Sequence, residues 1–330
     1  MNRSTISRRA ALALPLAAAL TGAASHASAQ AVAWPTRPVR LVVAFAPGGT
    51  VDLVSRYLAE RLTPLLGQPV VVENRPGAGG NLATEQVLRL PPDGYTFVVG
   101  GSPTHAVNPH LFKLSFDPIA DMSAVALLGS APNLLVLHPG VPANSVSELV
   151  ALARSQPGKL SFSSAGNGTS GHLAGELFRK QAGIDLQHVP YKGQADAITG
   201  VIRGDVAMAF VTVAGTLQQV KAGRMKAIAI TSRNRSALAS DLPTVAELGY
   251  PDFEVLAWYS VSGPKGIPSD IITRLAQALE RILKDPATAE RFQGWGADPT
   301  FLSGGAFSDF MNRDSARWGR VIREAGISPN

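Results

Sequence analysis

Hydrophobic and polar positions along most of this chain follow two periods in turn. Short apolar runs bounded by Gly, Pro or Asn are typical of buried strands, and apolar residues spaced three or four apart are typical of one helical face. Residues 39–66 show both patterns, because an apolar run at 39–45 is followed by Pro-Gly-Gly-Thr and then by an amphipathic stretch at 52–66. The alternation continues along the chain and predicts an α/β protein with mainly parallel sheets.

The predicted elements fall into two series. Predicted strands occupy residues 39–45, 70–73, 95–100, 125–128, 134–137, 160–164, 186–190, 206–211 and 253–261. Predicted helices occupy residues 52–66, 81–90, 146–155, 172–181, 195–203, 269–284, 287–293 and 306–325, and segments at 217–221, 227–231 and 245–248 continue the alternation. Ser145 and Glu148 have the capping-box spacing of a helix start. One glycine-rich strand-to-helix turn in each half predicts two lobes that face each other across a cleft.

The first 29 residues predict a secretory signal peptide that the mature protein lacks. Arg3, Arg8 and Arg9 give a basic start, residues 10–24 form an apolar run, and the segment ends in the small-x-small site Ala-Ser-Ala29. The run is shorter than the roughly 20 residues of a spanning helix, which argues against an uncleaved anchor. The paired arginines resemble a twin-arginine signal, and the choice between the two export routes stays open. We expect a periplasmic protein cleaved near Ala29.

Composition and charge exclude several classes of protein. The 330 residues are 45% hydrophobic and 16% charged, which suffices for a substantial core in one large or two ordinary domains. The absence of cysteine excludes a disulfide scaffold, thiol catalysis and thiolate metal sites. The formal charge is +6, but the leader holds three arginines and no acidic residue, so 27 basic and 24 acidic residues remain. This mild excess argues against nucleic-acid binding and suits an anionic small ligand.

The first glycine-rich turn is Pro47-Gly-Gly-Thr50-Val-Asp52. Glycines let backbone N–H groups approach a ligand, and the helix that follows adds its positive N-terminal end. A carboxylate or phosphate is the natural partner of such a turn. The alternative is a purely structural turn capped by Thr50 or Asp52.

The second glycine-rich turn spans residues 163–172 and contains one G-x-G-x-x-G at Gly166, Gly168 and Gly171. A dinucleotide site would require an acidic residue at the far end of the next strand. The nearest acid, Asp185, precedes that strand instead, so we do not expect a nucleotide cofactor. The hydroxyls and N–H groups of the turn still suit a carboxylate.

Two further segments are candidates for ligand contact. Tyr191-Lys192-Gly193 follows a predicted strand, and Lys192 could pair with an anion or lie in solvent. The segment at 100–105 also closes a strand, where Ser102 or Thr104 could reach a ligand or form a plain polar loop.

Catalytic and metal-binding patterns are missing from the sequence. The histidines of the mature chain are His105, His110, His138, His172 and His188, and none lies in a His-Glu-x-x-His pattern, so each is interpreted as structural. The run Gly168-Thr-Ser-Gly-His172 is not a nucleophile elbow, because its fifth position is His rather than Gly. We expect neither an enzyme, nor a metal site, nor a cofactor.

Taken together, these segments resemble the Bug-type receptors of tripartite tricarboxylate transporters, a TctC-like family of extracytoplasmic solute-binding proteins. The matching segments are WPTRP at 34–38, FAPGG at 45–49, GQP at 67–69, VVENRPGAGG at 71–80, PDGY at 92–95, VPANS at 141–145, PGKL at 157–160, GNGT at 166–169, HLAGELF at 172–178, HVPYKG at 188–193, DLPTVAE at 241–247 and GPKGIP at 263–268. They cover essentially the whole mature chain in order.

The resemblance implies a two-lobed periplasmic-binding-protein (Venus flytrap) fold, in which each lobe is a mainly parallel sheet flanked by helices. We expect lobe 1 at 30–129 plus 254–330 and lobe 2 at 130–253. It also implies a receptor that holds a small carboxylate between the lobes for the permease subunits of a transporter. The alternative is a receptor of the same fold that signals to a two-component sensor kinase. A monomer is expected.

The candidate ligand-binding residues combine the two turns with the segments that the family uses. They are Phe45, Pro47, Gly48, Gly49, Thr50, Asp52, Ser102, Thr104, Ser164, Gly166, Asn167, Gly168, Thr169, Tyr191, Lys192 and Thr212. One departure concerns ligand choice: many family members carry Asp-Asn where this chain has Val211-Thr212. Loss of that acid implies a plain di- or tricarboxylate or an aromatic acid rather than an amino acid.

Overall fold

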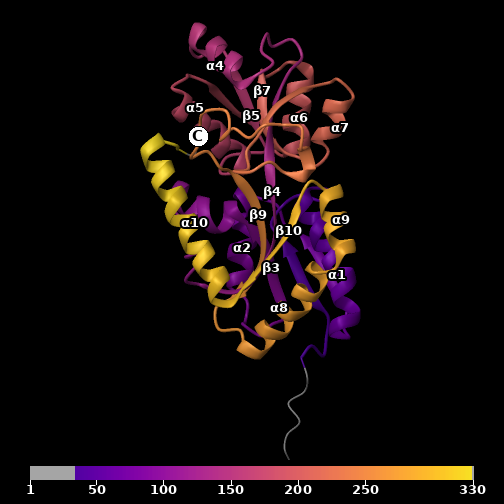
Figure 1. Ribbon diagram of the computed structural model, residues 1–330. Coiled ribbons are helices and arrows are strands. Elements are labelled where there is room, and N and C mark those ends of the chain that lie inside the picture. Colours follow the sequence, from indigo (N-terminus) through magenta and orange to yellow (C-terminus); the bar gives the residue numbers. More distant parts are fainter. Residues whose placement is uncertain (1–33, 329–330) are drawn as a thin grey trace, which may run out of the picture. The chain divides into compact units, whose positions relative to one another are not determined.

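The computed structural model describes residues 34–328 (Figure 1). The chain divides into two compact units, 1–36 and 37–330, and the fold described below is that of the second. The predicted leader at 1–29 and its cleavage near Ala29 lie outside the described residues.

The first half of this unit is built around three parallel strands in the order β2-β1-β3. Its elements are β1 (Val39–Val43), α1 (Thr50–Leu66), β2 (Val70–Asn74), the short 3₁₀ turn η1 (Ala78–Gly80), α2 (Asn81–Leu88), β3 (Thr96–Gly101), the π-helical turn η2 (Pro103–Val107) and α3 (Asn108–Leu111). Val and Leu side chains of β1 and β3 are buried and contribute to the hydrophobic core of this half. These elements follow the predicted order closely.

The second half repeats this plan with a parallel core in the order β7-β5-β6. Its elements are α4 (Val146–Ser155), β5 (Ser161–Ser164), α5 (Ser170–Ala182), β6 (Gln187–Pro190), α6 (Gln194–Arg203), β7 (Met208–Thr212), α7 (Thr216–Lys221), β8 (Lys226–Ile230) and η3 (Ala237–Ala239). The Ser145 hydroxyl accepts the Glu148 N–H, which confirms the predicted helix start. The segment at 245–248 forms turns rather than an element.

Two long antiparallel strands, β4 (Met122–Leu137) and β9 (Leu256–Pro264), connect the two halves. The shorter β10 (Asp298–Ser303) pairs with the part of β4 that lies in the first half. Figure 1 shows β4 continuing from one half into the other. It pairs with β9 as far as Pro132, and from Asn133 onward it pairs with β7 and β8. The prediction of two separate strands at 125–128 and 134–137 was therefore wrong. Pro132 lacks an N–H, but it lies where β4 changes partner strand, so it does not end the strand.

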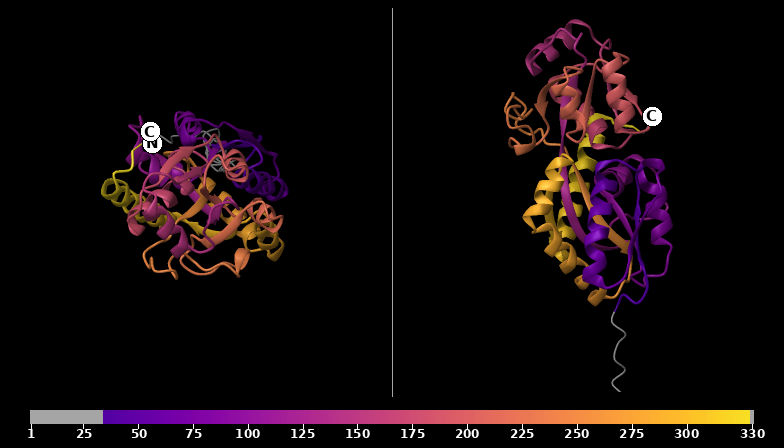
Figure 2. Two further views of the ribbon diagram at one scale, coloured as in Figure 1. Left: turned by 90° about the horizontal axis from the view of Figure 1, so that it is seen from above. Right: turned by 90° about the vertical axis from the view of Figure 1, so that its right-hand side faces the viewer.

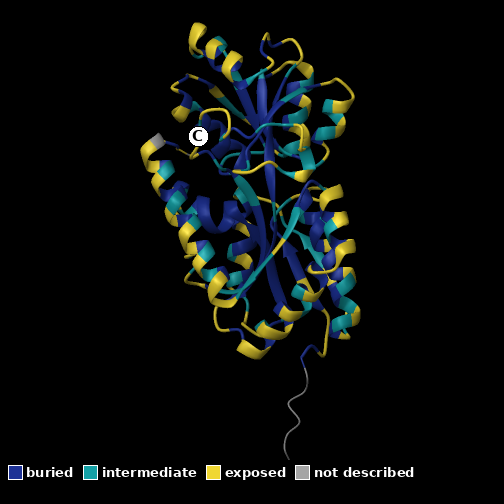
Figure 3. Cartoon of the chain, in the orientation of Figure 1, coloured by how far each residue is buried: buried dark blue, intermediate teal, exposed yellow. Residues whose placement is uncertain are grey.

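The chain ends with three helices that pack on the first half: α8 (Ser269–Leu283), α9 (Pro286–Gly294) and α10 (Gly304–Ala325). Figure 2 (right) shows these gold and yellow helices on one side of that half and the indigo and purple segments on the other. Most residues of the central strands β1, β3, β4, β7 and β9 are buried, whereas the helices are exposed on their outer faces (Figure 3). Within residues 34–328 no helix combines the length and the apolarity needed to cross a membrane. The two halves correspond to the two expected lobes, and the exact lobe boundaries stay a prediction.

Candidate functional site

The strand directions place the predicted site segments at two sheet edges. Because β1, β2 and β3 are parallel, the segments that follow them, at 44–49, 75–80 and 102–107, lie at one edge of the first sheet. For the same reason the segments after β5, β6 and β7, at 165–169, 191–193 and 213–215, lie at one edge of the second sheet. The carboxyl ends of parallel strands are where open α/β sheets bind ligands.

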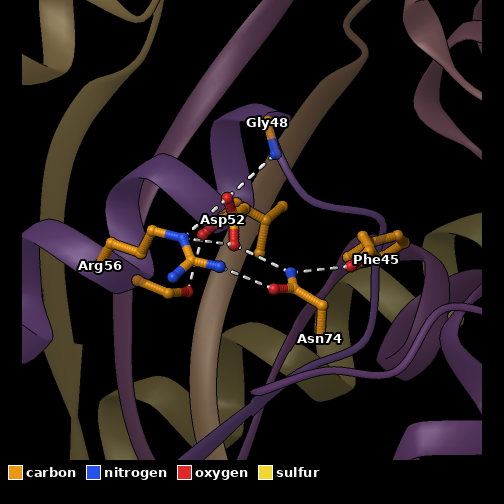
Figure 4. Close-up of polar contacts among 7 residues, drawn as sticks. Phe45, Gly48, Asp52, Arg56 and Asn74 are labelled. Atoms are coloured by element: carbon orange, nitrogen blue, oxygen red, sulfur yellow. Dashed lines mark hydrogen bonds and ion pairs between the residues drawn. The ribbon is translucent and has the colours of Figure 1, made fainter. Parts of the chain in front are cut away.

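Asp52 is the centre of the first turn (Figure 4). Its carboxylate accepts hydrogen bonds from the Gly48 N–H at 2.9 Å, from Arg56 Nε at 3.1 Å and from Asn74 Nδ2 at 2.9 Å. Asn74 Nδ2 also donates to the Phe45 carbonyl at 3.1 Å. Burial alone would raise the pKa of Asp52, yet the hydrogen bonds from Arg56, Gly48 and Asn74 hold it below its ordinary value.

This network changes the roles expected from the sequence. Gly48 N–H is already bonded to Asp52, and the carboxylate of Asp52 faces protein donors, so both brace the turn. The Thr50 hydroxyl bonds to Tyr259 of β9. The first backbone hydrogen bond of α1 runs from the Leu53 N–H to the Gly49 carbonyl. The N–H groups of residues 50–52 therefore point out of the helix N-terminus, which is the arrangement that attracts an anion.

Ser102 and Thr104 lie deeper than the sequence suggested. Thr104 is fully buried, and its hydroxyl is bonded within the turn to Gly101 and to His105 Nδ1. Ser102 is 3% exposed, and its Oγ has no hydrogen-bond partner among the described residues. Neither hydroxyl faces solvent in this structure, so both lie in the interior beneath the edge of the first sheet.

The second turn is ordered by its own side chains. Ser164 Oγ accepts the Gly166 N–H at 3.2 Å and lies 2.7 Å from His188 Nε2. The Thr169 hydroxyl donates to the Gly166 carbonyl at 2.7 Å. The Gly168 N–H donates to His172 Nδ1 at 3.1 Å. The first backbone hydrogen bond of α5 runs from Leu173 to Thr169, so this helix too begins with outward-pointing N–H groups.

Gly171, the last glycine of the G-x-G-x-x-G pattern, has a packing role. A Cβ at this position would lie 2.2 Å from the Phe210 carbonyl oxygen of β7, so only glycine lets α5 approach the sheet this closely. Close packing of α5 on β7 is therefore sufficient to explain the glycine at position 171.

His172 and His188 stack beneath the second turn, with ring centroids 4.2 Å apart. Burial, together with the neighbouring His172 charge, lowers the pKa of His188 to about 3, and burial lowers the pKa of His172 to about 4. Unfolding would return both towards the ordinary value of about 6.5. At pH values between the folded and unfolded pKa values, the unfolded chain binds more protons than the folded one.

We therefore expect the free energy of unfolding to fall as the pH is lowered from about 6.5 to about 4. Urea unfolding at pH 7, 6 and 5 measures this loss, and His188→Gln should show a smaller one. His138→Gln, which alters a histidine outside the stack, serves as the control and should follow the wild type. Equal pH dependence in the wild type and both variants would contradict the assignment of this stability loss to the stacked histidines.

The two edges meet at Asn108, a residue that the sequence analysis did not select. Asn108 Nδ2 donates to the Gly79 carbonyl at 3.1 Å and to Asn81 Oδ1 at 2.8 Å. Its Oδ1 is buried without a hydrogen-bond partner among the described residues. A Cβ added to Gly168 would lie 2.5 Å from this oxygen. Asn108 thus joins the loop after β2, the start of α3 and the second turn.

Three further predicted residues lie at the ends of strands of the second sheet: Tyr191 and Lys192 follow β6, and Thr212 is the last residue of β7. Tyr191 donates its N–H to the Ser164 carbonyl at 3.0 Å, which ties it to the second turn. The Thr212 hydroxyl is bonded to Gln194, whose Nε2 also donates to the Ala214 carbonyl at 2.8 Å. Lys192 is exposed. Gln194 was missed because no local pattern marks it, whereas Asn74 could have been found as a polar residue at a strand end.

The two sheet edges, which meet at Asn108, combine two helix N-termini with hydroxyls and amides. No group of three or more His, Asp or Glu side chains suited to a metal occurs among residues 34–328. This set of donors offers hydrogen bonds and positive partial charge to a small anion.

Comparisons with known proteins agree on one family. Residues 54–327 match the family model described as tripartite tricarboxylate transporter family receptor. The protein BugT of Bordetella pertussis is 34% identical over 310 residues, which cover 93% of this chain and 94% of BugT. The solved structure of Rpa4515 of R. palustris with adipate is 35% identical, with a TM-score of 0.83, and the match covers 90% of this chain and 100% of that one.

A third relative has a different ligand. MatC (Rpa3494) of Rhodopseudomonas palustris, solved with bound malate, is 31% identical with a TM-score of 0.78, and the match covers 88% of this chain and all of that one. The family consists of solute-binding receptors rather than enzymes. By sequence along nearly its whole length and by fold, this chain belongs to the tripartite tricarboxylate transporter receptor family, the Bug-type solute-binding proteins.

Proposed function

We propose that this chain is a periplasmic receptor that captures a small carboxylate between its two lobes and presents it to the permease of a tripartite tricarboxylate-type transporter. The observation that carries the proposal is the approach of the second glycine turn to Asn108, which is bonded to the loop after β2 at the edge that also holds the first glycine turn, with a helix N-terminus behind each glycine turn. The relatives solved with adipate and malate support a dicarboxylate as ligand. Export with cleavage near Ala29, and lobe boundaries near residues 130 and 253, are part of the proposal.

The donors present are sufficient for useful affinity. A neutral hydrogen bond contributes about 1 kcal/mol and one to a charged group roughly 2 kcal/mol. Four or five such bonds to the carboxylates of one ligand would approach the about −8 kcal/mol of micromolar binding. Closure of the lobes on the ligand would then distinguish the loaded receptor from the empty one.

A thermal-shift panel tests this function. We expect adipate, malate, succinate or citrate to raise the melting temperature of the mature protein, since a ligand at a hundred times its Kd stabilises the fold by about 2.7 kcal/mol. Adipamide, which keeps the chain length of adipate but lacks its charges, is the matched control and should have no effect. Because Val211-Thr212 stands where many family members carry Asp-Asn, aspartate should shift the melting temperature less than succinate.

The panel can also fail clearly. Folded, ligand-free protein that no di-, tri- or aromatic carboxylate stabilises would refute carboxylate capture at the two turns. A larger shift with aspartate or glutamate than with succinate would refute the preference for plain acids while leaving the receptor function in place.

A further inference from the structure

The first residue of each helix behind a glycine turn is hydrogen-bonded to a strand that connects the two halves. Helix α1 begins at Thr50, whose hydroxyl bonds to Tyr259 of β9. Helix α5 begins at Ser170, whose hydroxyl donates to Asn133 Oδ1 of β4 at 3.1 Å. All four residues are buried, so both bonds are shielded from water. The two helix starts are thus attached to the same pair of strands.

The two connecting strands are themselves joined where the chain crosses between the halves. They pair with each other as far as Pro132 of β4. Just beyond, the buried Thr231 hydroxyl accepts the Asn133 N–H at 2.8 Å and donates to the Val255 carbonyl at 2.6 Å. The Thr231 N–H also donates to the Asn133 carbonyl at 2.9 Å. The backbone of Asn133 is therefore fixed, and its side chain links the start of α5 to that fixed point.

Stability alone does not explain an asparagine at position 133. Its Nδ2 is buried without a hydrogen-bond partner among the described residues, and an unpaired buried donor destabilises the folded state. The strand continues through the apolar residues Leu134–Leu137, so pairing of β4 does not require an amide here. Among the described residues, the bond from Ser170 is the contact that requires a polar side chain at this position. The amide is accounted for by what it does to α5.

We propose that Asn133 and Tyr259 are positioning residues, which hold the starts of α5 and α1 to β4 and β9 and thereby fix how the two helix starts lie relative to each other. The proposal rests on the function proposed above, in which both helix starts face one carboxylate. Each residue acts through the hydroxyl that it holds, without touching the ligand itself. A fixed arrangement of the two sets of N–H groups lowers the cost of ordering them when the ligand binds.

Spin-label distances in the ligand-free mature protein test the proposal. The chain contains no cysteine, so Glu60→Cys on α1 and Gln181→Cys on α5 place one label at an exposed position on each helix. In this labelled protein we expect Tyr259→Phe and Asn133→Leu each to broaden the distribution of distances between the labels. The bond that ties one helix start to the connecting strands is lost in each case.

Tyr57→Phe is the matched control. It removes another buried tyrosine hydroxyl, which lies two turns into α1 and 3.0 Å from the Thr288 hydroxyl, and it should leave the distribution unchanged. Ser170→Ala removes the other half of the bond to Asn133, and it provides a second variant should Asn133→Leu fail to fold. Combining the two substitutions should broaden the distribution no further than either alone, because both remove the same bond. Thermal unfolding establishes that each variant is folded.

Titration with adipate, malate, succinate and citrate separates this proposal from the proposed function. For an acid that binds the wild type, Tyr259→Phe and Asn133→Leu should each weaken binding about fivefold, the effect of one hydrogen bond. Asn133→Leu should do so without lowering the melting temperature, because it also removes the unpartnered Nδ2; a purely structural residue would lose both.

The outcomes are distinct. A wild type that binds none of these acids would refute the receptor function, and the ligand-free distances would still decide the positioning role. Distributions as narrow as that of the wild type in both variants, equal broadening by Tyr57→Phe, or unchanged affinity for an acid that binds the wild type would each overturn the proposal.

Discussion

Gly168→Ala should weaken the binding of the proposed carboxylate ligand at least about tenfold, which corresponds to about 1.4 kcal/mol. Gly168 has a φ of +76°, and a methyl group there would lie 2.5 Å from Asn108 Oδ1. Relief of this overlap requires either that the Asn108 amide leave its hydrogen bonds to Gly79 and Asn81 or that the second turn move away from α3. Either change disturbs the contact between the two edges that would hold the ligand. Titration of the variant with the acid that most stabilises the wild type measures the loss.

Gly183→Ala is the matched control. Gly183 is the C-cap of α5, the helix that follows the turn containing Gly168. It has a φ of +59°, and nothing lies within 4 Å of an added Cβ. It should therefore lose about 1 kcal/mol of stability from backbone strain while keeping its affinity. Combining Gly168→Ala with Asn108→Ala should restore part of the affinity by removing the oxygen. Unchanged binding by Gly168→Ala would show that the ligand does not need this contact.

Asp52→Ala should lower the free energy of unfolding by about 2 kcal/mol. The side chain of Asp52 is 4% exposed, and its removal leaves Gly48 N–H, Arg56 and Asn74 without their common acceptor. The first turn should then lose its fixed geometry, so ligand affinity should fall with stability. Urea unfolding and ligand titration of the same preparation measure the two effects.

Asp196→Ala supplies the comparison for Asp52→Ala. Asp196 is the third residue of α6, as Asp52 is of α1, and both helices follow a glycine N-cap. Asp196 is exposed, so its loss should cost only the helix-dipole contribution of about 0.5 kcal/mol. If both variants lost the same stability, the network around Asp52 would contribute nothing beyond its place in the first helical turn.

Local patterns predicted much of this fold. The apolar run and amphipathic stretch at 39–66 became β1 and α1, and the Ser145 capping box marks the start of α4. These signals depend on residues close in sequence, so they can be read without the tertiary structure. The strand β10 was not predicted, because its side chains are only half-buried and show no apolar run.

The continuous strand β4 and the roles of Asp52, Asn108 and Gln194 depend on distant partners. Pro132 predicts the end of a strand only when the partner strands of β4 are unknown. The Asp52 carboxylate would be interpreted as a ligand contact if its hydrogen bond from Asn74 were unknown. Asn108 carries no local signal, because its partners are 27 to 60 residues away in the chain.

The sequence by itself determined the class of the protein: two α/β lobes, a glycine-rich turn in each, and ordered family segments from residue 34 to 268. Glycine turns and apolar periods act through backbone conformation and burial, which are local properties of the chain. Only the tertiary structure decided which turn groups brace the site, which hydroxyls are buried and how the lobes meet at Asn108. Those features arise from hydrogen bonds and packing between segments that the fold alone brings together.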